Sequence, residues 1–542
     1  MALLTLVEDR PTPKAVYNRR VYLCATAASF ASCMIGYDSA FIGTTMALPS
    51  FAREFAFADR SPQDLALLKQ TIVSVYQAGA LLGSLVAYAL GHFIGRRRAL
   101  LLFATVFLAG AGMMLGATRE RGGTGLIVGG RVLAGFAVGG CSNITPIYIS
   151  ELAPPAVRGR LVGIYELGWQ VGGLAGFWIN YGVDATISPG RKQWRIPFAV
   201  QLIPGGLLLI GALFIPESPR WLFSIGRRRQ ATEILCWVRG LDRDDAYVVH
   251  EIGQIDAGLH RHQRGFWKPF LSLKKRRTQW RFLLGVLLFV FQNGSGINAI
   301  NYYSPTVFRN VGIRGTSASF LTTGIFGVVK TVLTIVWLLV MVDHVGRRKL
   351  LMIGAVGGSL CMWCIGALIK ISDAGPAPAN APLSSSGIAA VFFLYLWTAF
   401  YVPTWNGTPW VISSEMFDPD TRSLGQANAA ANNWLWNFIV TRFTEQMFLA
   451  WRYGVFFLFA SLMAVSFFFV FFCVPETKSI PLECADRLFE TKPTWRANVV
   501  LLEELRQEDA EATGGAGARE LHNMERLAEG DKWVTQGKQQ SG

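Results

Sequence analysis

The chain has 542 residues, of which 51% are hydrophobic, 13% aromatic and only 16% charged, and its mean hydropathy is +0.33. These values favour a protein that crosses a membrane several times over a soluble enzyme. The formal net charge of +15 does not indicate nucleic-acid binding, because Lys and Arg are grouped in short loops between apolar segments, as on the inner side of membrane proteins. The sequence shows no nucleophile set, metal-ligand cluster or nucleotide loop, so we expect neither an enzyme nor a metal or cofactor.

Residues 1–20 are polar and basic and carry no cleavable signal pattern, so we expect them in the cytoplasm. The apolar segments that follow have about 20 residues each, enough to cross a ~30 Å hydrocarbon core as a helix. We expect twelve spans, near residues 21–43, 69–90, 99–117, 125–147, 160–182, 196–215, 281–303, 318–341, 349–370, 387–412, 424–448 and 452–474. An even number of spans would return the C-terminal tail to the cytoplasm, and the basic loops agree with this topology.

Three short motifs occur twice in the same order, at nearly constant offset. They are Gly95-Arg96-Arg97-Arg98 with Gly346-Arg347-Arg348-Lys349, Ser150-Glu151 with Ser414-Glu415, and Pro216-Glu217-Ser218 with Pro475-Glu476-Thr477. This repeat predicts two six-helix halves with a solute site between them. We therefore divide the chain into an N-terminal segment 1–20, an N-terminal half 21–215, a cytoplasmic linker 216–280 with short helices, a C-terminal half 281–474 and a cytoplasmic tail 475–542.

Four formal charges lie within the predicted spans, at Asp38, Arg131, Glu166 and Lys330. Each costs several kcal/mol unless it is paired or hydrated, so each is a functional candidate. Asp38 and Arg131 lie roughly 8 to 10 Å below the outer ends of their spans, at about 1.5 Å per residue, so they can meet. A carboxylate beside a guanidinium stays ionised, whereas a buried carboxylate without that partner tends to bind a proton. A proton symporter needs this chemistry; a permanent structural ion pair is the alternative.

Lys330 lies close to the predicted membrane midplane, where an ammonium needs an anion. A carboxylate on the transported solute would serve. The alternatives are a protein acid, such as Glu166, or snorkelling of the lysine toward the membrane surface. An acid and a base in one pocket suit a substrate that carries both hydroxyls and a carboxylate.

The stretch from Gln292 to Phe308 places several side-chain amides after an apolar run. An amide without a partner in lipid costs a few kcal/mol, so these side chains are expected to face a protein interior or a wet cavity. Their spacing predicts that Gln292, Asn298 and Asn301 lie near one helix face. Such donors and acceptors suit a polyhydroxylated ligand.

The tenth predicted span contains Gly407 and Pro409. These two residues should interrupt the helix, which membrane proteins tolerate where the backbone lines a cavity.

These motifs resemble the signatures of the sugar porter family of the major facilitator superfamily. The matching stretches are Gln292 to Ala299 with Tyr302-Tyr303, the two Gly-Arg-Arg loops, Pro146 to Gly159, Pro216 to Arg220 and Pro475 to Lys478. The resemblance covers about residues 20–490 and implies an all-α fold of twelve transmembrane helices in two pseudo-symmetric halves. The chain departs from the family pattern at His92, Glu166 and Asn293, where an Asp, a Gln and a second Gln are usual.

The resemblance also implies roles for individual residues. Asp38 and Arg131 would couple transport to protons, and Tyr302 and Tyr303 would form an outer gate. The substrate would contact Glu166, Gln292, Asn293, Asn298, Lys330, Trp410, Asn433 and Asn437. A cytoplasmic clasp that closes the outward-facing state would comprise Arg96, Arg97, Glu151, Arg158, Glu217, Arg220, Asp343, Arg347, Arg348, Glu415, Arg422 and Glu476.

Two of these roles have simpler alternatives. Trp410 could serve only to pack the core. The clasp could be a solvated basic loop, although such a loop would need neither Glu151 nor Glu415.

Within the family, the chain is most similar to the fungal quinate permeases. The stretches that carry this similarity are Leu6 to Lys14, Ser32 to Gly43, Tyr165 to Gln170 and Trp397 to Pro419. The similarity implies a multi-pass plasma-membrane protein with both termini cytoplasmic. Its partners would be quinate or a related polyol acid, protons and the lipid bilayer. A hexose or galacturonate symporter is the first alternative, and a non-transporting nutrient receptor is the second, although receptors of this kind tend to have longer cytoplasmic tails.

Overall fold

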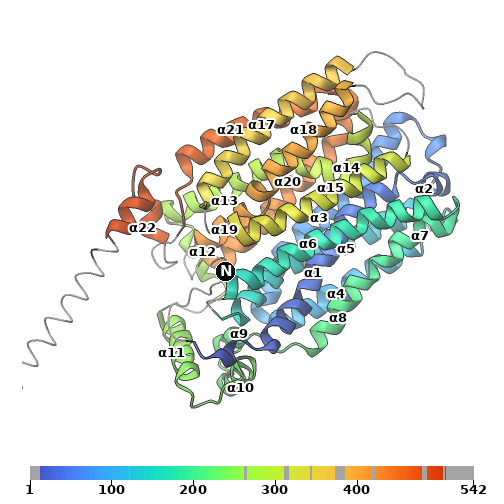
Figure 1. Cartoon of the computed structure of the whole chain (residues 1–542). Helices are drawn as coiled ribbons and strands as arrows, with labels where there is room; N and C mark the ends of the chain where they lie inside the picture. The colour runs from blue at the N-terminus through green and yellow to red at the C-terminus, as the bar shows by residue number, and fades with distance from the viewer. Residues whose placement is uncertain are drawn as a thin grey trace, which may run out of the picture.

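The structure is a computed structural model of the whole chain and is a bundle of long helices (Figure 1). It describes residues 12–120, 123–154, 157–261, 265–310, 316–341, 345–372, 385–417, 421–478, 485–504 and 507. The N-terminal half and the C-terminal half lie side by side, with their long helices running in roughly the same direction across the molecule (Figure 1).

The N-terminal half begins with the 3-10 turn η2 (Lys14–Tyr17). Its helices are α1 (Arg19–Thr45), α2 (Pro49–Glu54), α3 (Pro62–Phe93), α4 (Arg96–Leu115), α5 (Gly123–Leu152), α6 (Arg158–Thr186), α7 (Arg191–Val200) and α8 (Leu202–Phe214), with the turn η3 (Phe57–Asp59) between α2 and α3. The linker forms α9 (Pro219–Ser224), α10 (Arg228–Arg239), α11 (Ala246–Arg261) and α12 (Lys268–Ser272).

The C-terminal half repeats this plan with two π-helical turns. Its elements are α13 (Arg276–Gly294), α14 (Ile297–Asn310), α15 (Thr316–Val336), the π-helix η5 (Trp337–Met341), α17 (Arg347–Ser372), α18 (Ser385–Tyr401), the π-helix η6 (Val402–Asn406), α19 (Thr408–Glu415), α20 (Arg422–Trp451) and α21 (Gly454–Cys473). The short α22 (Ala485–Glu490) follows in the tail.

The twelve predicted spans can be followed through the described part of the chain. Eight spans are long and apolar enough to cross a membrane, and the bent pair α13 and α14 makes a ninth. Three further helices, α1, α6 and α20, have 27, 29 and 30 residues. These three are long enough to cross. They are not among the nine apolar spans, and they carry amides and charges that face the interior.

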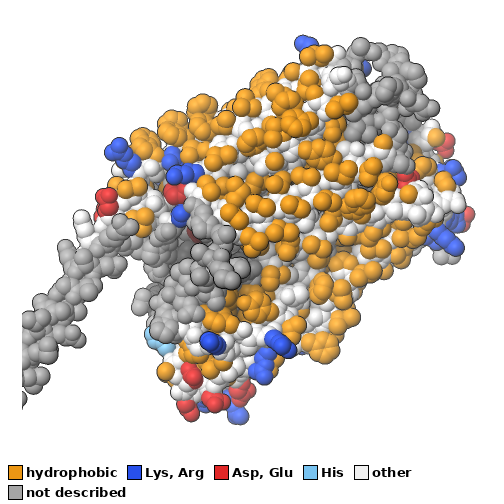
Figure 2. Space-filling model, viewed as in Figure 1, with side chains coloured by type: hydrophobic (Ala, Val, Ile, Leu, Met, Phe, Trp, Pro, Cys, Tyr) orange, Lys and Arg blue, Asp and Glu red, His pale blue; other side chains and the backbone are white. Residues whose placement is uncertain are grey.

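On the face shown in Figure 2, apolar side chains cover the middle of the bundle and charged side chains gather toward its two ends. Large apolar side chains such as Leu82, Phe214 and Phe392 are exposed on the outer surface. A soluble protein rarely exposes so continuous an apolar surface, whereas a bilayer covers it. Each half also has a buried apolar cluster, and each cluster includes a few side chains of the other half, such as Trp434 in the first and Phe177 in the second.

The linker contacts the N-terminal half through Arg239, whose side chain is held by a buried ion pair within the linker. Arg239 at the end of α10 binds both carboxylate oxygens of Glu251 on α11, at 2.6 and 2.8 Å. Its remaining nitrogen donates to the backbone oxygen of Leu152 at the end of α5, at 2.8 Å. Because a bidentate Arg–carboxylate pair is strong and geometrically specific, the linker helices are held under this half.

Glycines let α3 and α5 cross with their backbones in contact. A Cβ atom added to Gly135 would lie 2.0 Å from the backbone oxygen of Tyr76, and one added to Gly139 would lie 1.9 Å from that of Ala80. Small residues four apart are a common way to bring membrane helices together. Arg131 lies one turn away on α5 and donates to the backbone of α3 beside this crossing.

We predict that Gly135→Leu destabilises the protein by at least about 1–3 kcal/mol, the usual effect of overpacking. The matched control is Gly112→Leu on α4, where a Cβ atom meets nothing within 4 Å. Size-exclusion chromatography and thermal unfolding in detergent will compare the two variants. If both variants unfold at the same temperature, the close crossing is not important for stability.

Candidate functional site

Asp38 on α1 and Arg131 on α5 form an ion pair inside the N-terminal half. Arg131 Nη1 lies 2.7 Å from Asp38 Oδ2, and both side chains are 0% exposed. The guanidinium also donates from Nε to the backbone oxygen of Ile72 at 3.2 Å, and it lies 4.2 Å from the ring centre of Tyr76. Removing one partner would leave an uncompensated buried charge, which is strongly unfavourable. The meeting of Asp38 and Arg131 expected from their depth is therefore present in the structure.

The ion pair lies beside a contact between the two halves. Ser39, next to Asp38, accepts a hydrogen bond of 3.2 Å from the hydroxyl of Tyr302 on α14. Nearby, a Cβ atom on Gly43 would lie 1.9 Å from the backbone oxygen of Tyr302, so α1 and α14 touch along their backbones. A movement of α1 that disturbs Asp38 would therefore also disturb this contact. Tyr303, by contrast, donates to the backbone oxygen of Thr441 within the C-terminal half, at 3.0 Å.

The amide-rich stretch is not one continuous helix, which corrects the expectation that Gln292, Asn298 and Asn301 share a helix face. The helix breaks between α13 and α14, and the two pieces meet at an angle of 44°. Gly296 has a φ of +89°, a conformation that glycine adopts readily. The amides are therefore brought together by a bend between two helices rather than by helical periodicity.

Two amides on this break reach other helices of the C-terminal half. Gln292 donates to the backbone oxygens of Trp405 and Asn406 in η6, at 3.0 and 2.8 Å. Asn293 donates to Asn433 Oδ1 on α20 at 3.4 Å, and Asn298 donates to Asn293 Oδ1. The π-helical turn η6 replaces regular helix just before Gly407, so the predicted interruption of the tenth span is confirmed.

Asn437 lies one turn beyond Asn433 on α20 and is also buried. Its Oδ1 atom has no hydrogen-bond partner among the described residues. A buried acceptor of this kind is unfavourable unless a ligand or water satisfies it, so Asn437 is suited to bind a hydroxyl donor.

Glu166 and Lys330 lie on facing helices but are not joined as an ion pair. The Glu166 carboxylate accepts hydrogen bonds from Asn406 of the other half at 2.7 Å and from Gln170 at 3.2 Å. Lys330 is 8% exposed, and its ammonium donates to Asn301 Oδ1 on α14 at 3.2 Å. Among the described residues, no carboxylate comes within 4.0 Å of this ammonium. The structure therefore contains no direct ion pair between Lys330 and Glu166, which was the alternative.

Aromatic side chains line this region. Trp410 packs edge-on against Phe289, with ring centres 4.7 Å apart. Trp434 on α20 crosses to the N-terminal half, where its indole nitrogen donates to Ser142 Oγ at 3.0 Å. Its ring centre lies 6.3 Å from that of Trp169 and 6.0 Å from that of Tyr76. Sequence reasoning missed Asn406, Trp434 and Ser142, because only the packing of distant helices shows that they bridge the halves.

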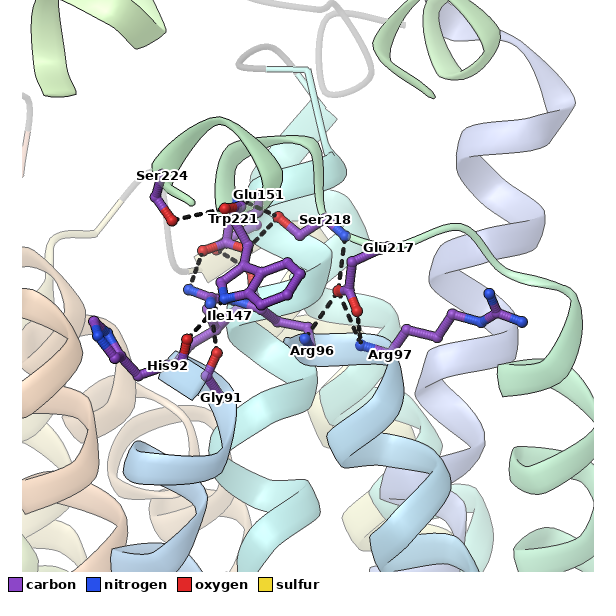
Figure 3. A network of polar contacts seen from close by, with 11 residues as sticks. Gly91, His92, Arg96, Arg97, Ile147, Glu151, Glu217, Ser218, Trp221 and Ser224 are labelled. Atoms are coloured by element: carbon purple, nitrogen blue, oxygen red, sulfur yellow. Dashed lines mark hydrogen bonds and ion pairs between the residues drawn. The ribbon is translucent and has the colours of Figure 1, made fainter. Parts of the chain in front are cut away.

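At the end of the bundle that carries the linker, a cluster of basic and acidic residues joins α4, α5 and α9 (Figure 3). Glu217 accepts hydrogen bonds from the backbone nitrogens of Arg96, Arg97 and Ser218, at 2.8, 3.0 and 2.9 Å. This carboxylate therefore caps the N-terminus of α4, where the helix dipole favours negative charge. Arg96 also pairs with Glu151 at 2.8 Å, and Glu151 accepts from Ser218 Oγ at 2.5 Å.

The C-terminal half contains the same cluster at the repeated motifs. Glu476 accepts from the backbone nitrogens of Arg347 and Arg348 at the start of α17, at 2.9 and 3.1 Å. Arg347 pairs with Glu415 at 3.1 Å, and Glu415 accepts from the hydroxyl of Thr477 at 2.6 Å. The motif repeat is thus a repeat of contacts as well as of sequence.

The outer arginines of the two clusters also correspond. Arg97 donates to the backbone oxygens of Ala212 and Leu213 at the end of α8, at 3.0 and 2.6 Å, and Arg348 donates to that of Phe471 near the end of α21, at 2.8 Å.

The remaining residues of the predicted clasp do not take part in the contacts given above. Arg422 donates to the backbone oxygen of Phe417 at 3.5 Å, and Arg220 is exposed. Asp343 and the side chain of Arg158 lie outside the described residues. The hydrogen bonds and ion pairs that define each cluster join residues of one half, so the joining of the two halves by a clasp stays a prediction.

This architecture, with two repeated helical halves and buried polar groups between them, is that of a membrane transporter. The chain belongs to the sugar (and other) transporter family, whose model matches residues 24–489. It is 68% identical to a quinate permease of Neurospora terricola over 93% of this chain and 95% of that protein. It is 62% identical to a probable quinate permease of Aspergillus terreus, over 94% of each.

Solved structures agree with this assignment. The proton:xylose symporter XylE bound to 6-bromo-6-deoxy-D-glucose has a TM-score of 0.71 and 27% identity, covering 86% of this chain and 99% of that one. A partially occluded, inward-open form of the xylose transporter XylE from E. coli has the same TM-score, 26% identity, and coverage of 86% and 100%. The family and the fold class predicted from the sequence are confirmed.

We predict that Glu217→Ala lowers stability by about 1–3 kcal/mol, because three backbone donors lose a charged acceptor. The control is Glu233→Ala on α10, whose side chain is 63% exposed and pairs with Arg229 four residues away. That surface pair should contribute only about 0.3–0.5 kcal/mol. Thermal unfolding in detergent measures both variants, and equal losses would contradict the capping role of Glu217.

Proposed function

We propose that the protein is a quinate permease that imports quinate together with protons by alternating access. The observation that carries this proposal is the buried ammonium of Lys330, which has an amide rather than an acid as its hydrogen-bond partner. Relatives named quinate permease, 60 to 68% identical over at least 93% of this chain, support it. We further propose that the protein resides in the plasma membrane with both termini in the cytoplasm.

Quinate is a cyclohexane polyol with one carboxylate, which is ionised above about pH 4 as ordinary carboxyls are. A buried ammonium that is not part of an ion pair is costly, so a bound carboxylate would stabilise Lys330 and be held by it. Asn301 would keep the ammonium in place. The ring hydroxyls would then meet Gln292, Asn293, Asn298, Asn433 and Asn437, whose amides both donate and accept.

Glu166 and Trp410 complete the proposed substrate site. Glu166 is an acceptor for substrate hydroxyls, and its hydrogen bond to Asn406 reaches across to the other half. A substrate hydroxyl that replaces Asn406 as the donor to Glu166 would therefore change the contact between the halves. Trp410 would pack on the apolar face of the ring, next to Phe289.

Asp38 and Arg131 form the proposed proton site. While the two side chains pair, Asp38 stays ionised; a proton on Asp38 would release Arg131 and weaken their attraction. Because Ser39 contacts Tyr302, the protonation of Asp38 would be transmitted to the proposed outer gate of Tyr302 and Tyr303. The two Arg–Glu clusters would form the clasp at the opposite end when the outer side opens.

The first test is uptake of labelled quinate into transporter-deficient yeast that express the chain, with and without a protonophore. Glucose and galacturonate serve as comparison substrates. We expect quinate uptake that the protonophore abolishes. Uptake of glucose alone would contradict the role of Lys330, and uptake of galacturonate alone would point to a different polyol acid. No uptake by protein that reaches the surface would favour the nutrient receptor.

We predict that Lys330→Gln raises the KM for quinate roughly tenfold or more, because a hydrogen bond to a charged group contributes about 1.5–3 kcal/mol. The control is Lys370→Gln, since Lys370 is an exposed lysine at the end of another span. Initial rates over a range of quinate concentrations measure the effect. An unchanged KM in Lys330→Gln protein would show that the carboxylate binds elsewhere.

We predict that Asp38→Asn abolishes quinate accumulation against a gradient but leaves exchange of labelled for unlabelled quinate measurable. The reason is that an amide cannot bind and release the coupled proton. Asp59→Asn is the control, because Asp59 lies in a turn and its side chain is 72% exposed. Accumulation that survives in Asp38→Asn cells would place the coupling proton on another residue.

A further inference from the structure

Residues 265–277, which we name the basic-aromatic segment, connect the linker to the first helix of the C-terminal half. Phe266 holds the segment against the end of α3. Its ring centre lies 5.2 Å from those of Tyr88 and Phe93 and 5.6 Å from that of His92. The hydroxyl of Tyr88 also donates to the backbone oxygen of Phe266, at 3.2 Å. The segment is therefore placed directly beside the apolar surface of the bundle.

The segment exposes large apolar side chains next to this anchor. Trp267 is 71% exposed and Leu271 is 59% exposed. Phe93, at the end of α3, is 64% exposed and stacks on Phe266. Exposed apolar side chains that adjoin a spanning helix suit the boundary between lipid headgroups and acyl chains, where Trp is enriched.

Basic residues follow at once. Lys274, Lys275 and Arg276 are exposed, and they form no ion pair within the described part of the chain. Arg277 pairs with Glu490 at the end of α22. Residues 265–281 contain no Asp or Glu, so no acid within this stretch neutralises the three cations.

A second basic run in the same linker lacks these properties. Arg227, Arg228 and Arg229 are also exposed, but Arg228 pairs with Asp256 at 2.7 Å and Arg229 pairs with Glu233 at 3.0 Å. Within the described residues, two of these three arginines thus have acidic partners, whereas Lys274, Lys275 and Arg276 have none.

We infer that the basic-aromatic segment binds anionic phospholipid headgroups of the adjoining leaflet. Lys274, Lys275 and Arg276 would contact the phosphates and carboxylates, and Trp267 and Leu271 would enter the acyl boundary. A cluster of basic residues beside a spanning helix is a known way to attract anionic lipid, and apolar side chains beside it increase the binding. The rival occupant is the acidic stretch 503–511 of this chain, whose carboxylates would pair with Lys274, Lys275 and Arg276. Such pairing would not cover Trp267 and Leu271.

The test uses the purified full-length chain in detergent, titrated with phosphatidylserine or phosphatidylcholine, with bound lipid counted by native mass spectrometry. We expect the wild type to retain phosphatidylserine in preference to phosphatidylcholine. The variant K274Q/K275Q/R276Q should lose this preference at least several-fold, whereas R227Q/R228Q/R229Q should keep it. Equal retention by wild type and K274Q/K275Q/R276Q, or an equal loss in both triple variants, would overturn the inference.

Two further variants separate a lipid from other occupants. W267S/L271S should weaken retention of phosphatidylserine several-fold. Unchanged retention would mean that the headgroup charge alone is bound and that Trp267 and Leu271 do not enter the acyl boundary, which contradicts the inference. Neutralising the tail with E508Q/D509N/E511Q should leave retention as in the wild type. A large gain there would make the acidic tail the occupant and overturn the inference. All variants are compared only as monodisperse protein that melts within a few degrees of the wild type.

Discussion

The structure depends on one constraint: a charge inside a membrane-spanning bundle must have a partner. Asp38 and Arg131 pair at 2.7 Å with no exposure to solvent, and Gly135, one turn from Arg131, lets α3 and α5 touch. The pair is stable while both groups are charged and together. Since Ser39 contacts Tyr302 of the other half, the proposed protonation of Asp38 would act next to a contact between the two halves.

Each half contains the same kind of helix cap. Glu217 and Glu476 each cap the first turn of a helix that begins with a pair of arginines. Glu151 and Glu415 then pair with the first arginine of each half. A carboxylate that accepts backbone hydrogen bonds is fixed in position, so each half has a rigid end. Rigid ends are what two bodies need if they are to rock against one another around a central site.

Much of this could be predicted from the sequence because the signals are local or repeated. Apolar segments predicted the spans, and the repeated motifs predicted the halves. The depth of Asp38 and Arg131 predicted that they could meet. The bend at Gly296 was not predicted, because amides six residues apart in an apolar stretch fit an unbroken helix equally well. The bridges made by Asn406 and Trp434 could not be predicted either, since each depends on a helix more than a hundred residues away in the chain.

The most direct measurement places purified protein in liposomes with the outside more acidic than the inside. Potassium and valinomycin hold the membrane potential at zero. Proton-coupled transport predicts that labelled quinate accumulates inside above its external concentration and leaks out when the pH gradient is collapsed. Entry that only reaches equal concentrations, with or without the gradient, would contradict the account.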